Sequence, residues 1–278
     1  YVVGKPSTGF GGDSKMHDST FGWRFINPKM QQLFGTDGMG TTAENLVDKY
    51  NISREDQDQF AYWSQMKATK AQNNGRLAKE IIPVEIPQRK KDAIQFSKDE
   101  FVKPASSKEI LAKLRPAFKK EGGTVTAGNS SGINDGAVAT IIASEEAVKK
   151  YNLIPMARIV SSAVAGVEPR IMGIGPVQAS NKALEKAGLT MKDIDIIELN
   201  EAFAAQALAC TRAWGLADDD VRINPNGGSI AIGHPLGVTG ARIVYSAALE
   251  LHEQQKRYAL ITMCIGVGQG YAAIIERV

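Results

Sequence analysis

Cysteine and histidine are scarce in this sequence. The 278 residues contain Cys210 and Cys264, and His17, His234 and His252. Two cysteines are too few to staple a small secreted fold, so we expect a reducing compartment, the cytoplasm. The five residues show no metal-ligand spacing, so no metal site is expected. No run of ~18 consecutive apolar residues occurs, so nothing in the sequence predicts a membrane span.

The sequence also lacks a recognisable beginning. Tyr1 stands in place of an initiator Met, and the first ten residues, YVVGKPSTGF, have neither a charged start nor a long apolar stretch. They therefore do not resemble a signal peptide. We expect that the 278 residues begin in the interior of a longer polypeptide.

The overall charge is small, but its distribution is uneven. A net charge of +3 with 43% apolar and 23% charged residues is typical of a soluble globular protein and does not predict nucleic-acid binding. Residues 88–120, however, hold ten Lys or Arg against four Asp or Glu. This stretch is either a solvated face or a contact for a partner that carries phosphates.

Residues 1–121 are rich in loops and helices. A helix is predicted to begin near Thr41, with Glu44 reaching back as in a capping box, and Ser53 is predicted to cap the next helix. Asn74-Gly75 should end that second helix. A short strand, IIPVEI, and the basic stretch follow it.

Residues 122–278 predict an α/β arrangement, with a mixed sheet and helices on its faces. Strands are expected in TVTAG, GAVATIIAS, ARIVSSAVAG, IDIIELN, SIAIG, RYALITMCIG and GYAAIIERV. Helices are expected in SEEAVKKY, VQASNKALEKAGL, EAFAAQALACTRAWGL and GARIVYSAALELHEQQ. The last two strands are separated by three residues only, which predicts an antiparallel hairpin.

Two polar residues stand in loops at predicted strand ends, where ligands of open α/β sheets collect. Asn200 ends an apolar strand and opens an Ala-rich helix, so it is either a helix N-cap or an amide that holds a water or a carbonyl oxygen. His234 lies between Gly233 and Pro235. It is either a structural group or an imidazole placed for acid/base work.

A third loop contains Cys264, which ends a strand and is followed by alternating glycines. Buried cysteine is usually a small hydrophobe, and this is our interpretation of Cys210 within its Ala-rich helix. The glycines around Cys264 leave room for a substrate and for backbone N–H donors, so a catalytic role is the alternative there.

Three motifs identify the chain as a member of the thiolase family. NEAFA, NPNGGSIAIGHPLG and CIGVGQG occur in the order and spacing of the closing domain of thiolases, and TVTAGNSSGINDGA and MGTTAEN match further thiolase signatures. The resemblance covers essentially all 278 residues. It implies an acyltransferase that moves an acyl group between coenzyme A and a cysteine thiolate.

The resemblance also implies roles for four residues. His234 would activate the nucleophile and, with a water held by Asn200, form an oxyanion hole for the thioester oxygen. Cys264 would be the second acid/base group. The backbone N–H of Gly266 would contribute to the other oxyanion hole, because a developing enolate needs donors that are already in place.

Coenzyme A is expected as substrate and product rather than as a permanently bound cofactor. By the same resemblance, Ser131 would contact its pantetheine arm, which Ala202 and Phe203 would line. Lys103 falls where thiolases hold the nucleotide end of coenzyme A, which favours phosphate contact for the basic stretch.

The resemblance implies a thiolase fold of mixed five-stranded sheets with helices on their faces. It divides the chain into a loop domain (1–121), the last strand and helix of the N-terminal domain (122–151) and the C-terminal domain (152–278). The nucleophilic cysteine of the family lies before the loop region. We therefore expect that the nucleophile is not among these residues, and that residues 1–278 alone neither fold stably nor turn over without an N-terminal thiolase segment as partner.

Within the family, FGWRFINP (21–28) and TMCIGVGQG (262–270) resemble bacterial 3-oxoadipyl-CoA thiolases of aromatic-acid degradation, which are expected to form homodimers or homotetramers. Their substrate ends in a carboxylate, for which Lys5, Arg24 and Arg170 are candidate partners. Alternatives are a general acetyl-CoA acetyltransferase, a fatty-acid 3-oxoacyl-CoA thiolase or, from another class, a non-catalytic acyl-CoA-binding protein. Ketosynthase relatives fit less well, because they use a pair of histidines.

Overall fold

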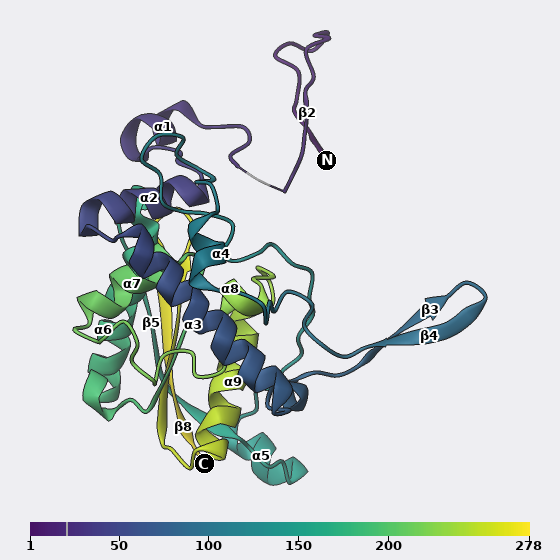
Figure 1. Ribbon diagram of the computed structural model, residues 1–278, viewed down its shortest axis with the longest axis vertical. Coiled ribbons are helices and arrows are strands. Elements are labelled where there is room, and N and C mark those ends of the chain that lie inside the picture. The colour runs from purple at the N-terminus through teal and green to yellow at the C-terminus, as the bar shows by residue number, and fades with distance from the viewer. Residues whose placement is uncertain (21) are drawn as a thin grey trace.

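A four-stranded mixed sheet forms the centre of the protein in a computed structural model that describes residues 1–20 and 22–278 (Figure 1). The strands follow the order β5 (Ala157–Gly166), β8 (Gln269–Arg277), β7 (Tyr258–Ile265) and β6 (Ile196–Leu199). β6 pairs with β7 in parallel, and the other two pairings are antiparallel. The α/β arrangement and the closing hairpin predicted from the sequence are thereby confirmed.

Helices cover both faces of this sheet, because successive side chains of a strand point to opposite sides. Leu260 and Ile274 face α6 (Gly175–Ala187) and α7 (Ala204–Ala213) in the larger core cluster. Their neighbours Ala259, Ile261 and Ile275 pack with α9 (Thr239–Glu253) on the other side. α6 ends at Gly188, whose φ of 66° requires the left-handed region that glycine favours.

The strand predicted in SIAIG is wrong. SIAIG does not extend the sheet, because Ser229–Ile232 form a short helix, α8, that ends at Gly233. The residues after Gly228 turn back on themselves, with the N–H of Ile232 donating to the carbonyl of Gly228 at 2.9 Å. A short apolar run is compatible with strand or helix, so its periodicity could not decide between them. The described sheet therefore has four strands rather than five.

Helices dominate the N-terminal part, with α1 (Pro28–Phe34), α2 (Met39–Tyr50) and α3 (Arg54–Asn73) following one another. Ser53 caps α3 as predicted, and the helix ends before Asn74. The predicted capping box of α2 is wrong. Gly38 is its N-cap, and the Glu44 carboxylate instead accepts hydrogen bonds from the backbone N–H groups of Thr124 and Val125.

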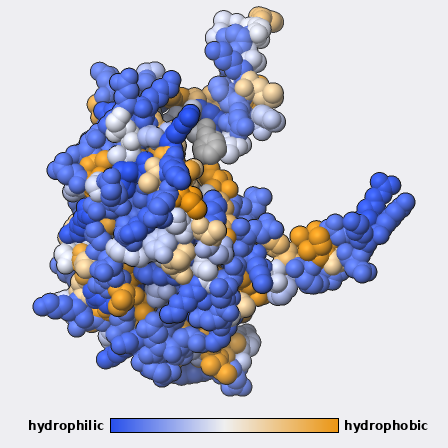
Figure 2. All heavy atoms as spheres, in the orientation of Figure 1, coloured by the Kyte–Doolittle hydropathy of each residue, from blue (hydrophilic) through white to orange (hydrophobic). Residues whose placement is uncertain are grey.

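Two short hairpins extend from the body. β1 (Val2–Val3) and β2 (Met16–His17) pair near the N-terminus, and β3 (Val84–Gln88) pairs with β4 (Lys91–Phe96) in a projecting arm (Figure 1). Figure 2 shows hydrophobic spheres along the arm and a hydrophilic tip. The predicted IIPVEI strand is therefore partly confirmed, and the beginning of the basic stretch, up to Phe96, folds into this hairpin.

The structure of residues 122–144 differs from the strands predicted there. No strand forms between these residues, although α5 (Glu145–Tyr151) follows as expected. A strand needs a neighbour for its backbone hydrogen bonds. Here Ile141 and Ile142 are exposed at 88% and 80% instead. The predicted strands in TVTAG and GAVATIIAS are thus absent from the described residues.

The remaining elements are short. They are η1 (Leu77–Glu80), α4 (Lys108–Ala112), η2 (Pro169–Ile174) and η3 (Met191–Asp193). Among the described helices, none has the length and apolar character needed to cross a membrane. Phe21, the first residue of the FGWRFINP stretch, lies outside the described residues.

Candidate active site

The three loops selected from the sequence meet at the carboxyl ends of β6 and β7. Asn200 directly follows β6, and its backbone N–H donates to the carbonyl of Thr262 on β7 at 3.0 Å. Cys264 lies two residues further along β7. The N-cap of α7 is Phe203, so the interpretation of Asn200 as a helix cap is wrong. Its buried side chain is left for other contacts.

His234 is held by its own loop through both the backbone and the ring. Its N–H donates to the carbonyl of Gly132 at 3.0 Å. Its Nδ1 lies 2.7 Å from Oγ1 of Thr239, and that hydroxyl donates to the carbonyl of Pro235 at 3.1 Å. With the hydroxyl proton assigned to Pro235, the ring proton is assigned to Nδ1, which donates to Oγ1. Nε2 is then left with a lone pair.

This lone pair faces the amide of Asn200. Nδ2 of Asn200 lies 3.3 Å from Nε2 of His234, while its Oδ1 accepts a hydrogen bond of 2.6 Å from the hydroxyl of Ser229. Burial, with a smaller contribution from the positive charge of Arg242, lowers the pKa of His234 to about 4. The imidazole is therefore neutral at physiological pH and can accept a proton at Nε2.

Cys264 lies near the end of β7, in a small apolar cluster. Its neighbours there include Ala43, Ala202 and Phe203. The residue is only 8% exposed, and burial raises the pKa of its thiol to about 12. A thiol in this environment stays protonated at neutral pH and is a proton donor rather than a ready nucleophile.

Gly266 follows Cys264 at the start of the turn between β7 and β8. A side chain at this position would meet little, since the nearest atom to an added Cβ is Cε of Met39 at 3.9 Å. The turn is fixed further on, where the N–H of Val167 donates to the carbonyl of Gly268 at 2.8 Å. The backbone near Cys264 is thus open to a ligand on the side of Met39.

The loop 129–132 joins the Asn200 loop to the His234 loop. The N–H of Ser131 donates to the carbonyl of Ala202 at 3.0 Å, and the N–H of Ala204 donates to that of Asn129 at 2.9 Å. Phe203 meets Phe118 edge to face, with 6.0 Å between ring centroids. The structure therefore brings Ser131, Ala202 and Phe203 together. It adds Phe118, which the sequence did not indicate.

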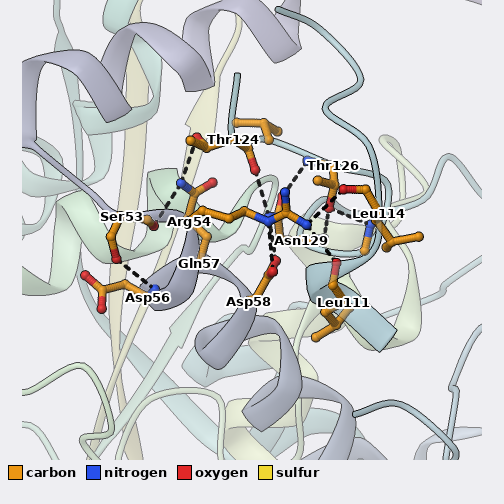
Figure 3. A network of polar contacts seen from close by, with 12 residues as sticks. Ser53, Arg54, Asp56, Gln57, Asp58, Leu111, Leu114, Thr124, Thr126 and Asn129 are labelled. Atoms are coloured by element: carbon orange, nitrogen blue, oxygen red, sulfur yellow. Dashed lines mark hydrogen bonds and ion pairs between the residues drawn. The ribbon is translucent and has the colours of Figure 1, made fainter. Parts of the chain in front are cut away.

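A polar network anchors this loop to α3 (Figure 3). Nδ2 of Asn129 donates to the carboxylate of Asp58 at 2.9 Å, and Arg54 pairs with the same carboxylate at 2.8 Å. Arg54 also donates to the carbonyls of Leu111 and Leu114. Buried charges are tolerated where they are paired and hydrogen-bonded in this way. The network fixes the loop that carries Ser131.

Lys103 is exposed near this loop. Its Nζ lies 4.9 Å above the ring of Phe101, within the range of a cation–π contact. That ring packs against the loop, since a Cβ added to Gly132 would lie 2.5 Å from it. The backbone N–H of Lys103 donates to Gln65 on α3 at 2.9 Å. The cation is therefore placed beside the loop of Ser131.

The three cations proposed for a substrate carboxylate belong to different segments of the chain. Lys5 belongs to the N-terminal hairpin segment, and Arg24 donates to the carbonyl of Gly22. Arg170 pairs with Asp37 at 3.0 Å. It lies on the wall of a pocket of about 480 Å³ that is lined by residues 31–37 and 168–170.

Cys210 lies within a helix rather than at a strand end. It is fully buried within α7, its Sγ donates to the carbonyl of Gly173 at 3.3 Å, and burial raises the pKa of its thiol. Its interpretation as a small core hydrophobe agrees with this environment. Within residues 1–20 and 22–278, no group of three or more His, Cys, Asp or Glu side chains is arranged to hold a metal ion.

Comparison with known proteins agrees with this geometry. The thiolase N-terminal domain matches residues 12–146, and the thiolase C-terminal domain matches residues 153–277. All 278 residues align at 56% identity with 69% of the beta-ketoadipyl-CoA thiolase of Acinetobacter baylyi. They align at 54% identity with 69% of the 3-oxoadipyl-CoA/3-oxo-5,6-dehydrosuberyl-CoA thiolase of Escherichia coli.

A solved structure shares the fold. The crystal structure of the Bacillus anthracis acetyl-CoA acetyltransferase matches the whole chain with a TM-score of 0.87 and 40% identity, over 68% of that protein. Matches of this identity and coverage to named thiolases go beyond a shared fold. The chain belongs to the thiolase family, whose members are acyltransferases that act on coenzyme A thioesters.

Proposed function

We propose that the protein cleaves 3-oxoadipyl-CoA with coenzyme A to succinyl-CoA and acetyl-CoA. The observation that carries a catalytic role is the contact between Asn200 and Nε2 of His234, in which a neutral imidazole presents its basic nitrogen beside an amide donor. The names of relatives that share 52–56% identity over the whole chain support this substrate. Pure acyl-CoA binding would not require such a pair.

His234 is the base of the first step. Its Nε2 accepts the proton of a nucleophilic cysteine, and the thiolate attacks the 3-oxo carbon of the substrate. The amide of Asn200 lies beside Nε2, so a carbonyl oxygen, or a water that bridges to it, finds a donor already in place. The role follows from a lone pair at Nε2, which the Thr239 contact secures.

Cys264 is the acid of the same step. When the bond between C2 and C3 of the substrate breaks, the electron pair stays on C2 of the departing acetyl-CoA. The thiol of Cys264 protonates this carbon, and its raised pKa keeps the proton available. The backbone N–H of Gly266 stabilises the enolate oxygen that forms meanwhile.

The second half of the reaction reverses the two proton transfers. The Cys264 thiolate takes the proton of an incoming coenzyme A thiol, and the coenzyme A thiolate attacks the succinyl thioester. The enzyme thiolate is released and recovers its proton from His234. Each group thus returns to its starting protonation state.

Coenzyme A binds along the loop of Ser131 in this proposal. The pantetheine arm contacts Ser131, Ala202 and Phe203. A backbone hydrogen bond joins Ser131 to Ala202, and Ala202 and Phe203 pack in one cluster with Cys264. Lys103 is exposed next to this loop and contacts a phosphate of the nucleotide end. Residues 1–121 then act as the loop domain and 152–278 as the C-terminal domain.

Neither cysteine of the chain is proposed as the nucleophile. Cys210 is buried and hydrogen-bonded within α7, and Cys264 is assigned as the acid. The 278 residues cover 69% of the length of the Acinetobacter baylyi and Escherichia coli relatives. We propose that the acyl-accepting cysteine lies on sequence outside these 278 residues.

Arg170 is the candidate partner for the terminal carboxylate of the acyl chain. Asp37 engages its Nε and Nη2. Nη1 has no hydrogen-bond partner among the described residues. Replacing Arg170 by Gln should lower kcat/KM for 3-oxoadipyl-CoA while leaving acetoacetyl-CoA unaffected. Arg158→Gln, an exposed arginine paired with Glu276 at the far end of β5, is the matched control. Equal losses on both substrates would contradict this assignment.

The substrate is tested by thiolysis with the full-length enzyme. With 3-oxoadipyl-CoA and coenzyme A, mass spectrometry should identify succinyl-CoA and acetyl-CoA, at a higher kcat/KM than acetoacetyl-CoA. A preference for acetoacetyl-CoA would favour the general acetyl-CoA acetyltransferase. Binding of coenzyme A in calorimetry without any turnover would favour the acyl-CoA-binding alternative. The proposed dimer or tetramer is tested by light scattering of the same sample.

A further inference from the structure

The orientation of the Asn200 amide matters for the proposed reaction. Turning the amide by 180° exchanges Nδ2 and Oδ1, which have nearly the same shape. In one orientation a donor faces the lone pair of His234 Nε2, as in the structure at 3.3 Å. In the other, two acceptors would face each other. A neighbouring group must therefore select the first orientation.

Ser229 supplies this selection. Its hydroxyl donates to Oδ1 of Asn200 at 2.6 Å, and the two residues are 0% and 1% exposed. If the amide were turned, the hydroxyl would accept from Nδ2 instead, and its own buried proton would lose Oδ1 as acceptor, which is costly away from water. With Oδ1 held by Ser229, Nδ2 is directed to His234.

Ser229 is itself fixed in place by the start of α8. The N–H of Ile230 donates to the Glu201 carboxylate at 3.2 Å, and the N–H of Gly228 donates to the hydroxyl of Ser64 at 3.1 Å. Ser64 in turn donates to the same carboxylate at 2.6 Å. Gly228 packs so closely that an added Cβ would lie 2.2 Å from Glu201. The hydroxyl of Ser229 thus stands on a rigid turn.

We propose that Ser229 is a positioning residue, which holds the Asn200 amide with its NH₂ group toward His234 and the reacting oxygen. This inference rests on the proposed roles of Asn200 and His234. Ser229 acts through Asn200 and makes no contact with substrate. The helix α8, which the sequence did not predict, is what brings its hydroxyl to the site.

The kinetic test compares Ser229→Ala with Ser180→Ala in the full-length enzyme. Ser180 is a suitable control, because its hydroxyl is equally buried but has no hydrogen-bond partner among the described residues. Ser229→Ala should lower kcat for thiolysis about fivefold to tenfold with little change in KM for coenzyme A. Ser180→Ala should leave both within about twofold.

A double-mutant cycle separates positioning from a structural role. In an Asn200→Ala background, Ser229→Ala should cause no further loss of kcat, since there is no amide left to orient. A second loss of equal size in that background would overturn the proposal. So would a kcat for Ser229→Ala that equals the kcat of Ser180→Ala.

A spectroscopic test does not depend on turnover. These 278 residues contain three histidines, so ¹⁵N-labelled histidine adds few resonances from this part of the enzyme. The Nε2 resonance of His234 should move in Ser229→Ala and stay in place in Ser180→Ala. Movement in an enzyme without thiolysis would refute the proposed function but support the positioning role. An unmoved resonance in an active enzyme would refute the positioning role alone.

Discussion

The hydroxyl oxygen of Thr239 lies 2.7 Å from Nδ1 of His234, and this contact decides which ring nitrogen carries the proton. The hydroxyl proton of Thr239 is assigned to the carbonyl of Pro235, and Oγ1 then accepts from Nδ1. The basic nitrogen is therefore Nε2, on the side of Asn200. Thr239 is the first residue of α9, five positions after the histidine, so the start of that helix sets the chemistry of the ring.

Replacing Thr239 by Val should therefore impair turnover. Valine has nearly the same shape but leaves the buried Nδ1–H without an acceptor. The cost of an unpaired buried donor corresponds to a fall in kcat of about tenfold or more. Thr239→Ser keeps the hydroxyl and should retain most of the activity. Steady-state thiolysis of both variants tests this. Equal activities of the two variants would show that the methyl group, rather than the hydroxyl, matters.

The positions of the site loops could be predicted from the sequence, but their connections could not. Apolar runs that end in Asn200 and Cys264 identify two strand ends, and parallel pairing of β6 with β7 brings them together. The partners Ser229 and Thr239 carry no comparable signal. Ser229 lies in a run that is compatible with strand or helix, and a threonine at a helix start usually has a local role.

Hydrogen bonds between residues far apart in the chain could not be predicted from the sequence either. Glu44 has the spacing of a capping residue, yet its carboxylate accepts from the backbone of Thr124, 80 residues away. Asn129 bonds to Asp58 across 71 residues. Local rules describe what a side chain can do near its own helix, and tertiary packing decides whether a distant backbone group competes successfully.

The burial of His234 predicts how stability should depend on pH. Its pKa is lowered from 6.5 to about 4 in the folded protein, so between these values the unfolded chain binds a proton that the folded protein does not. Stability is then lost as pH falls from 6.5 toward 4. His234→Gln lacks this titration. As the pH decreases, the unfolding free energy of the variant should fall less steeply than that of the wild type. The two slopes should differ by up to about 1.4 kcal/mol per pH unit.

Urea unfolding of wild type and His234→Gln at several pH values in this range measures the difference. The two stability curves should converge or cross as the pH falls. Parallel curves would contradict a lowered pKa for His234, because a group with the same pKa in both states contributes no pH dependence.

The two thiols should resist alkylation in the folded enzyme. Burial raises the pKa of Cys264 from 9.0 to about 12, so about a thousandfold less of it is thiolate at neutral pH. Cys210 is buried at 0% exposure and should react only on unfolding. Mass spectrometry of peptides after iodoacetamide treatment should find both unmodified in native protein and modified in guanidinium. Rapid native labelling of Cys264 would contradict its assignment as a protonated acid.

Gly268 should be essential to the turn that carries Gly266. Its φ is 88°, and an added Cβ would lie 2.2 Å from the carbonyl oxygen of Val167 and 3.0 Å from Pro169. Gly268→Ala is therefore both strained and sterically blocked, and should cost about 2 kcal/mol of stability. That cost corresponds to a Tm lower by about 5 °C. Because the clash displaces the turn beside Cys264, kcat should fall as well.

Gly166→Ala is the matched control for this turn. Gly166 pairs with Gln269 at the same end of the sheet, but an added Cβ there meets nothing within 4 Å, and its backbone lies outside the left-handed region. Its Tm should stay within about 2 °C of wild type. Calorimetric Tm values and thiolysis rates of the two variants test the contrast. Similar losses of Tm and rate in both variants would mean that any side chain at this end of the sheet is destabilising. The close approach of Gly268 to the carbonyl of Val167 would then not explain the effect.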